Sequence, residues 1–380
     1  MFVDRNIMSL CHLELSDFRN FSRAEVKPQR GINLFCGENG SGKTSLLEAI
    51  YYLGLGRSFK TRHTKRVIRH EQPQFLVFGK ISSGDTIGIE KNRDGSGRMR
   101  LSQEKIQSAA ELASALPLQL INPDSHRLIE GGPKARRQFI DWGVFHVKHD
   151  AFFPSWQKMR RVLRQRNLAL RQAMASKSNS KKKEVGAWDA ALVEQAMLLD
   201  KLRREYLDKF TPVFMQLLER LLRESEEPGV GEMKLCFYSG WDEKRGLQEE
   251  LQRALPRDFD LGHTQYGPHR ADLKIFVENL PAQDVLSRGQ QKMVVCAMSL
   301  AQAALLQKAT KKCLLLIDDL ASELDAKKRG ALCALLTNLK TQVFITGTDA
   351  LLFKGELGGD GRPSVFRVMQ KGGQGQILPE

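Results

Sequence analysis

One run near the N-terminus combines glycines, a lysine and hydroxyl side chains at a spacing that suits phosphate binding. It fits G-x-x-x-x-G-K-[ST] and reads Gly37, Glu38, Asn39, Gly40, Ser41, Gly42, Lys43, Thr44, Ser45. Glycines let the backbone N–H groups point at phosphate oxygens, and a helix that starts there adds positive potential. In this pattern Lys43 reaches the β- and γ-phosphates, and the Thr44 hydroxyl binds Mg²⁺. The run therefore predicts a site for ATP and Mg²⁺.

A second candidate is an apolar strand that ends in two carboxylates. Residues 314–317 read LLLI, and Asp318 and Asp319 follow them. Such a strand places a carboxylate beside the metal ion at its C-terminal end. We expect Asp318 to bind Mg²⁺ and Asp319 to orient or deprotonate the attacking water, with Lys43 completing the catalytic set. Gln119, at another strand end, is a weaker metal-ligand candidate.

A third segment precedes a predicted helix and reads LSRGQQK. A serine in this place is a common helix N-cap. The pattern LSxGQ upstream of an apolar strand ending in Asp-Asp also resembles the signature loop of the ABC ATPases. The resemblance implies that Ser287, Arg288, Gly289 and Gln290 of one subunit contact the γ-phosphate held by the other. Ser322 and Asp325, after the acidic strand, resemble that superfamily's D-loop.

Further blocks narrow the resemblance to the RecF family, ABC-type ATPases related to Rad50 and the SMC proteins. In chain order the blocks are Asp17-Phe18-Arg19-Asn20-Phe21, Gly56-Arg57-Ser58-Phe59, Asp141-Trp142-Gly143-Val144-Phe145-His146, Tyr266-Gly267-Pro268-His269-Arg270 and Ser287-Arg288-Gly289-Gln290-Gln291-Lys292. The resemblance covers essentially the whole chain. It implies an α/β fold, namely an ABC-type (SMC/Rad50-like) P-loop ATPase head with an inserted antiparallel helical arm.

The same resemblance implies a function and partners. It places Arg19 and Asn20 near the nucleotide and implies an ATP-dependent homodimer on double-stranded DNA near single-strand gaps. There the family promotes loading of RecA with RecR and RecO. Three departures from the wider superfamily predict slow hydrolysis: Arg288 in the signature, Asp319 in place of glutamate, and Thr346-Gly347-Thr348 where a histidine is expected. We expect a DNA-dependent ATPase whose weak hydrolysis is used as a switch.

The charge balance agrees with a polyanionic partner. The 380 residues include 59 Lys and Arg against 44 Asp and Glu, a formal net charge of +15. Such an excess favours nucleic acid or an acidic membrane surface. Without a base-reading module, we expect contacts with DNA phosphates. The candidates after the first helix are Arg57, Lys60, Arg62, Lys65 and Arg66, those on the arm are Arg160, Arg164, Lys181, Lys182 and Lys183, and further basic residues are Lys134, Arg136, Arg137, Arg161 and Arg166.

The elements that must position these residues follow from the apolar pattern. Strands are expected within 9–35 and 313–317, and a helix over 44–54 that stops at Gly54. Two long helical segments, 156–176 and 187–223, form the arm, with a break at Pro212. Later elements are a helix at 243–254, a strand–turn–strand at 263–279, helices at 289–309 and 323–340, and a strand at 342–346. The expected segments are an N-terminal head lobe (1–150), the arm (151–228) and a C-terminal head lobe (229–380).

Composition also bears on location and on other classes of protein. The sequence has no apolar run of membrane-spanning length, and its six cysteines form no C-x-x-C pair, so we expect no membrane partner and a cytoplasmic, nucleoid-associated protein with reduced thiols. A structural SMC-like tether remains open, although the short arm lacks sustained heptads. A transporter ATPase subunit is a further alternative, and a metabolic P-loop kinase would not need LSxGQ.

Overall fold

The structure is a computed structural model and describes residues 9–176, 184–227, 229–309, 312–319, 324–339, 341–353 and 363–379. Its packing divides the chain into two units. Unit 1 lies within Met1–Ser125, Phe214–Gly229 and Lys292–Glu380, and unit 2 lies within His126–Val213 and Val230–Gln291. The three segments expected from the sequence have other borders and remain a proposal.

An antiparallel sheet forms one layer of unit 1. Its strand order is β2-β1-β4-β5-β6-β7. Alternate side chains such as Leu13, Leu15 and Val77 are fully buried, which is the pattern of a sheet with one face on the core. The strands are β1 (Leu10–Phe18), β2 (Phe21–Val26), β4 (Gln74–Ile81), β5 (Thr86–Asn92), β6 (Gly97–Leu101) and β7 (Glu104–Ile106).

A second, mostly parallel sheet carries the ends of the predicted chemical segments. Its order is β15-β14-β3-β13-β12-β8, and only β15 pairs antiparallel. The central strands are buried along their whole length, as expected for a sheet covered on both faces. The strands are β3 (Ile32–Cys36), β8 (Leu118–Ile121), β12 (Leu314–Ile317), β13 (Val343–Gly347), β14 (Ser364–Lys371) and β15 (Gln374–Pro379).

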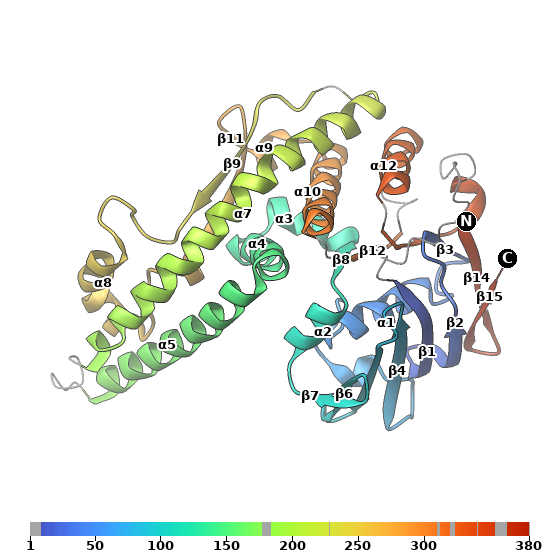
Figure 1. Cartoon of the computed structure of the whole chain (residues 1–380), viewed down its shortest axis with the longest axis horizontal. Coiled ribbons are helices and arrows are strands. Elements are labelled where there is room, and N and C mark those ends of the chain that lie inside the picture. Colours follow the sequence, from blue (N-terminus) through green and yellow to red (C-terminus); the bar gives the residue numbers. More distant parts are fainter. Residues whose placement is uncertain are drawn as a thin grey trace. The chain divides into compact units, whose positions relative to one another are not determined.

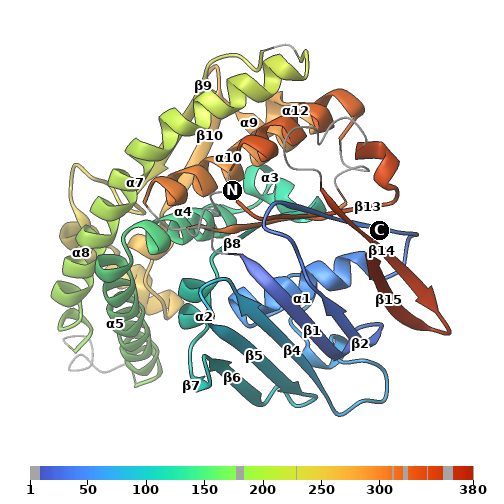
Figure 2. The same cartoon turned by 45° about the vertical axis from the view of Figure 1, so that its right-hand side comes forward.

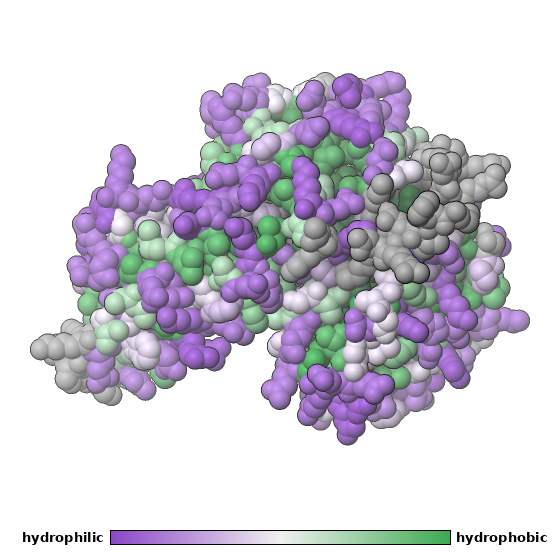
Figure 3. All heavy atoms as spheres, viewed as in Figure 1, coloured by the Kyte–Doolittle hydropathy of each residue, from purple (hydrophilic) through white to green (hydrophobic). Residues whose placement is uncertain are grey.

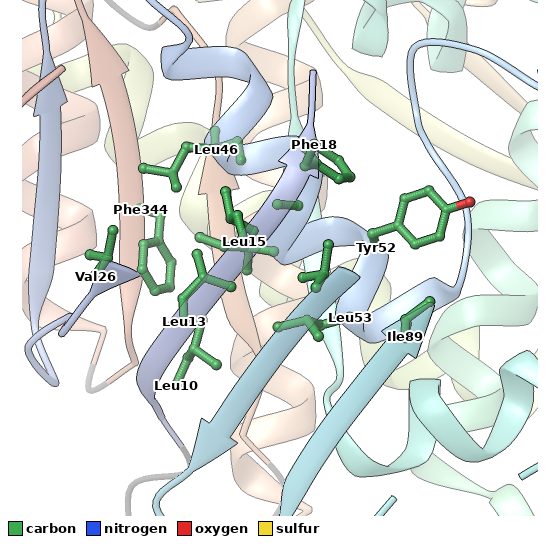
Figure 4. Packing of buried hydrophobic residues seen from close by; sticks show 14 of the residues in the cluster. Leu10, Leu13, Leu15, Phe18, Val26, Leu46, Tyr52, Leu53, Ile89 and Phe344 are labelled. Atoms are coloured by element: carbon green, nitrogen blue, oxygen red, sulfur yellow. The ribbon is translucent and has the colours of Figure 1, made fainter. Parts of the chain in front are cut away.

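Helix α1 (Lys43–Leu55) contacts strands of both sheets and forms the centre of the core of unit 1. Figure 1 and Figure 2 show it against the antiparallel sheet, and Figure 4 shows side chains of α1, β1, β5 and β13 in one cluster. The expected helix end at Gly54 is wrong: the helix continues to Leu55 and is capped by Gly56 at φ 63°. Gly54 serves close packing instead, because a Cβ there would lie 2.3 Å from the Leu118 side chain.

Unit 2 contains the helical arm. Figure 1 shows α5 (His149–Ser176) beside α7 (Asp189–Glu224), whose residues from Phe214 onward belong to unit 1. Ion pairs join Lys158 to Glu194 and Arg166 to Asp189, so residue numbers rise on one helix as they fall on the other. The two helices are therefore antiparallel, as the sequence predicted.

The predicted helix break at Pro212 is wrong, because α7 runs through it. The neighbouring side chains Phe210 and Phe214 are both fully buried. Packing of such side chains supplies most of the stability of helices in proteins. The free energy gained by packing these two side chains therefore outweighs the loss of the backbone hydrogen bond that proline removes.

The rest of unit 2 differs from expectation in two places. The helix expected at 243–254 is α8, which starts at Leu247 and ends at Leu261. Residues 263–279 were expected to form strand–turn–strand. The structure has one strand there, β10 (Asp272–Val277), and residues 264–271 before it form a loop with a short 3-10 turn. The small sheet has the order β11-β10-β9, with β9 (Met233–Tyr238), β10 (Asp272–Val277) and β11 (Leu280–Pro281). Further helices of unit 2 are α3 (Arg127–Glu130), α4 (Pro133–Val147) and α9 (Ala282–Val285).

The remaining helices connect the strands that carry the predicted site. They are α2 (Ala109–Ala115), α10 (Arg288–Lys308) and α12 (Ala326–Asn338). Helix α12 is shorter than the predicted 323–340, and Asp325 accepts a bond from the Lys328 N–H as its N-cap. Nowhere in the described part of the chain does a helix combine the length and apolarity needed to cross a membrane.

Candidate functional site

The loop between β3 and α1 has the backbone that the G-x-x-x-x-G-K-[ST] pattern requires. Gly42 has φ 114°, and a Cβ on it would lie 2.6 Å from the Asn20 side chain. A Cβ on Gly37 would lie 2.0 Å from the Val368 carbonyl oxygen of β14. Both positions therefore exclude a side chain. Strand β14 and the turn between β1 and β2 hold the loop from two directions.

Lys43 bridges this loop. Its ammonium donates to the carbonyl oxygens of Gly37 at 2.7 Å and Glu38 at 2.8 Å. Burial lowers the pKa of Lys43, while the carboxylates of Asp319 and Asp318 act in the opposite direction. A buried ammonium with two carbonyl partners can exchange them for phosphate oxygens, which are stronger acceptors.

A chain of hydroxyl and carboxylate groups lies where α1, β12 and β13 meet. The Thr44 hydroxyl donates to Asp318 Oδ1 at 2.9 Å, and the Thr346 hydroxyl lies 2.8 Å from the same oxygen. Burial raises the pKa of Asp318, and the bonds from the two threonines partly offset it. Hydroxyl and carboxylate oxygens are ligands that Mg²⁺ prefers, with phosphate oxygens and water completing its shell. Thr44 and Asp318 thus fit a magnesium ion.

Thr346 also positions Asp319. The Asp319 N–H donates to the Thr346 hydroxyl oxygen at 2.8 Å, and Asp319 has φ 56°, a left-handed conformation that is rare outside glycine. From the sequence, residues 346–348 stood out only because they lack the histidine expected in the wider superfamily. The signal that could have identified Thr346 is its place at the end of β13, directly beside β12 in the sheet.

The turn between β1 and β2 reaches the phosphate loop through Asn20. Its Nδ2 donates to the Ser41 carbonyl at 2.9 Å, and its Oδ1 is buried with no hydrogen-bond partner among the described residues. The Arg19 guanidinium donates to the fully buried Glu48 of α1 at 2.8 and 2.6 Å. Arg19 thus supports the helix behind the loop, and a contact of Arg19 with a nucleotide stays a proposal.

The geometry around Gln119 does not support a metal ligand. Its Nε2 donates to Gln302 Oε1 of α10. On β8 it pairs with Leu315, whereas Asp318 lies beyond the last residue of β12. Gln119 therefore lies inside the sheet, about 10 Å along the strand from the edge that carries Asp318.

A pocket of about 710 Å³ opens beside the phosphate loop. Residues of the loop, of the segment after β13 and of β14 line it, among them Asn39, Ser41, Thr348 and Arg367. Ser41 is 3% exposed, and within the part of the chain that the structure describes its hydroxyl has no hydrogen-bond partner. The loop thus borders a space large enough for a bound molecule.

The signature-like segment belongs to unit 2 and caps helix α10, whose residues from Lys292 onward belong to unit 1. The Gln290 N–H donates to the Ser287 hydroxyl at 3.2 Å, and the Ser287 N–H donates to Gln290 Oε1 at 3.0 Å, a capping box. Ser287 is exposed, and Arg288 pairs with Glu130 of α3. Of the D-loop residues, Asp325 caps α12, and Ser322 lies outside the described residues.

The basic candidates divide into exposed and structural residues. Exposed side chains belong to Arg57, Lys60, Arg62, Lys65, Arg66, Arg160 and Arg164, while Lys181, Lys182 and Lys183 lie outside the described residues. Figure 3 shows hydrophilic residues with apolar patches among them over α5 and α7.

Three other arginines have partners inside unit 2, and the prediction of Arg166 as a DNA contact is wrong because its side chain is fully buried. Arg166 is fully buried against Asp189 and Asp258, each at 2.7 Å. Arg136 pairs with Asp272 at 2.7 Å, and Arg137 donates to the Ala271 carbonyl at 2.6 Å. These arginines hold unit 2 together.

Comparison with known proteins adds independent findings. A family model described as "RecF/RecN/SMC N terminal domain" matches residues 9–356. The "DNA replication and repair protein RecF" of Azotobacter vinelandii (strain DJ / ATCC BAA-1303) is 46% identical over 346 residues, 90% of this chain and 92% of that protein. The "DNA replication and repair protein RecF" of Stutzerimonas stutzeri (strain A1501) is 45% identical over 366 residues, which are 95% of this chain and 96% of that protein.

Solved structures show the same fold. A recombination mediator protein RecF, described as RecF-ATPrS in the RecFOR pathway, gives a TM-score of 0.80 at 25% identity, over 98% of this chain and 99% of that one. An Smc head domain from Pyrococcus furiosus gives a TM-score of 0.60 at 14% identity, over 98% and 96%. The α/β fold of an ABC-type, SMC-like ATPase head, predicted from the sequence, is confirmed.

Proposed function

Because this chain belongs to the RecF/RecN/SMC N-terminal domain family, we propose that it is an ATP-dependent DNA clamp of recombinational repair. Relatives that are 46% and 45% identical are DNA replication and repair proteins called RecF. A solved structure of the same fold is that of the recombination mediator protein RecF with ATPrS. The formal net charge of +15 agrees with a nucleic-acid partner.

In this proposal the loop from Gly37 to Thr44 binds the phosphates of ATP. Lys43 exchanges its two carbonyl partners for the β- and γ-phosphates. Thr44 and Asp318 hold Mg²⁺, which would neutralise phosphate charge when bound. Asp319 orients the attacking water. The arrangement that supports this most directly is the 2.9 Å bond between Thr44 and Asp318, because it joins residues 274 positions apart at the end of the loop.

The proposed working form is a dimer that ATP holds together. Each chain supplies Lys43, Thr44 and Asp318 to one nucleotide, and Ser287 and Gly289 to the nucleotide of its partner. The exposed Ser287 hydroxyl can turn from the Gln290 N–H to a phosphate. The dimer holds duplex DNA beside single-strand gaps, where it promotes RecA loading with RecR and RecO. Slow, DNA-dependent hydrolysis then releases it. We place the protein in the cytoplasm, at the nucleoid.

Sedimentation velocity tests the dimer. Without nucleotide or with ADP the chain should sediment as a monomer, and with ATP and Mg²⁺ as a dimer that gapped duplex DNA stabilises. Lys43→Ala should remove nucleotide binding. Ser287→Ala should keep nucleotide binding and lose the dimer.

The control for Ser287→Ala is Ser108→Ala, because Ser108 forms a capping box with Glu111 at the start of α2. Each substitution removes one helix N-cap and lowers the free energy of unfolding by about 1 kcal/mol. Only Ser287→Ala changes a residue of the proposed dimer interface. A dimer of Ser287→Ala with wild-type stability would contradict the sandwich. If the wild-type protein has the same sedimentation coefficient with ADP as with ATP, the proposed ATP-dependent change from monomer to dimer is contradicted.

A further inference from the structure

A row of aromatic rings on α4 and α5 has no part in the proposed ATP site. The ring centroids of Phe145 and His149 lie 4.5 Å apart, those of His149 and Phe153 5.4 Å, and those of Phe153 and Trp156 6.5 Å. The planes of the last two pairs differ by only 23° and 20°. At its end the Arg160 guanidinium lies 4.6 Å from the Trp156 ring centroid. We call these five side chains the ring row.

The row occupies one face of α5, and this face is not the core face. Positions 149, 153, 156 and 160 follow one another at helical spacings of three and four residues. Its four rings are partly exposed, and Arg160 is exposed. The core face of the same helix carries other side chains, among them Phe152, which is 2% exposed, and Met159, which is 4% exposed. The ring row therefore lies beside the buried face of α5 and keeps part of its surface accessible.

Positive charge continues along the row. Arg160 and Arg164 are exposed and four residues apart, and within the described residues neither forms an ion pair. Their neighbours differ: Lys158 pairs with Glu194, and Arg166 is buried in an ion pair with Asp189. At the opposite end Asp150 adds one negative charge. The arginine end can therefore bind phosphates of a strand whose bases lie along the rings.

Aromatic rings beside unpaired guanidinium groups are the chemistry that binds single-stranded nucleic acid. Unpaired bases stack on aromatic rings whatever their sequence, and arginines bind the phosphates. Bases inside a duplex are stacked on each other, so a duplex would leave the rings unused. A protein partner could also cover aromatic rings, but two exposed guanidinium groups on the same face, neither with a carboxylate partner among the described residues, favour a polyanion.

We propose that the ring row is a stacking platform for single-stranded DNA. This inference rests on the proposed function only for the choice of DNA, and it assigns the single strand of a gap to α5. From His149 to Arg164 the helix rises about 22 Å, at about 1.5 Å a residue. That length suits roughly four nucleotides, the lower end of the sites known for such surfaces.

Fluorescence anisotropy of a labelled oligothymidylate of about twelve nucleotides, without ATP, tests the platform. The double variant Phe153→Leu/Trp156→Leu keeps apolar side chains and removes the rings. We expect it to bind the oligomer roughly ten-fold more weakly or worse, because each stacked base contributes substantially. Trp188→Leu is the matched control, since Trp188 is a partly exposed tryptophan outside the row, and it should bind like wild type.

An abasic oligomer with the same number of phosphates separates stacking from charge. Wild type should prefer oligothymidylate to the abasic oligomer, and the double variant should lose this preference. Arg160→Ala/Arg164→Ala should weaken the binding of both oligomers and keep the preference. Thermal midpoints of all variants near that of wild type exclude misfolding as the cause.

Several outcomes would overturn the platform. These are no binding of oligothymidylate by wild type, equal binding by wild type and Phe153→Leu/Trp156→Leu, or no preference of wild type over the abasic oligomer. ATP-dependent dimerisation, measured in parallel, should be the same for wild type and the double variant. If wild type fails to dimerise while the oligomer results hold, the proposed clamp fails and the platform stands.

Discussion

At the scale of single residues, Thr346 joins the two acidic groups of the candidate site. Its hydroxyl lies 2.8 Å from Asp318 Oδ1 and accepts the Asp319 N–H at 2.8 Å. It is fully buried, so water cannot replace it. Asp318 therefore depends on Thr346 for its orientation, in the way that metal ligands depend on the groups that bind them from behind.

Thr346→Val removes this hydroxyl at nearly constant volume. We expect Mg²⁺-dependent ATP binding to weaken about ten-fold, because loss of a group that orients a metal ligand costs about 10- to 100-fold. Titrating Mg²⁺ at fixed ATP with a fluorescent nucleotide measures the effect. Thr346→Ser keeps the hydroxyl and is the control. Equal Mg²⁺ dependence of the valine and serine variants would exclude this role.

The sequence predicted the parts of the site that are continuous in the chain. Lys43 and Thr44 belong to one motif, and Asp318 directly follows an apolar strand, so the local pattern was enough to select them as candidates. Thr346 and Glu48 escaped prediction because their roles depend on contacts across the fold. The Thr346 hydroxyl meets a carboxylate 28 residues earlier, and Glu48 meets Arg19 at a separation of 29.

At the scale of elements, arginines hold the loop from Thr264 to Asp272. Arg166 of α5 donates to the Thr264 hydroxyl at 2.8 Å, and Arg203 of α7 donates to the Pro268 carbonyl at 2.9 Å. Arg137 of α4 donates to the Ala271 carbonyl at 2.6 Å. The sequence predicted strands on both sides of a turn here. Bonds from three helices replace the first strand, and no local pattern contains them.

His269 lies inside this loop and makes unit 2 sensitive to acid. One ring nitrogen, Nε2, bonds the Thr264 carbonyl at 3.1 Å, while Nδ1 is buried and no described residue bonds it. Burial lowers the pKa of His269 to about 4, and the charges of Arg270, Arg137 and Arg166 act in the same direction. The folded protein therefore keeps this ring neutral at a pH where the unfolded chain protonates it.

The sign of the effect on stability follows from that difference. Below about pH 6.5, the usual histidine pKa, the unfolded chain binds a proton that the folded one refuses, so stability falls until about pH 4. Between about pH 6.5 and pH 5 the loss is about 2 kcal/mol. His269→Gln should reduce the drop in thermal midpoint between about pH 7.5 and about pH 5. His70→Gln is the control, because its side chain is 92% exposed. An unchanged drop in His269→Gln would contradict a buried neutral ring.

At the scale of the whole molecule, the formal net charge of +15 is not evenly available to a partner. Arg166 and Arg203 are 0% and 2% exposed and bind carboxylates and backbone oxygens inside unit 2. The basic side chains after α1 are exposed. Composition alone could not separate structural arginines from those that can reach DNA, because burial follows from the tertiary fold.

Duplex DNA binding should therefore depend on the exposed set and fall steeply with salt. Each phosphate contact releases counterions and adds about 0.9 to the slope of log affinity against log salt concentration. Arg62→Ala/Lys65→Ala should lower this slope by nearly two, as measured by anisotropy of a labelled duplex between about 50 and 200 mM salt. The control is Lys80→Ala/Lys274→Ala, which removes two exposed lysines from strands outside the candidate set. Equal slopes for the two double variants would show that the loop after α1 does not carry the duplex, and a flat profile for wild type would exclude a phosphate-binding clamp.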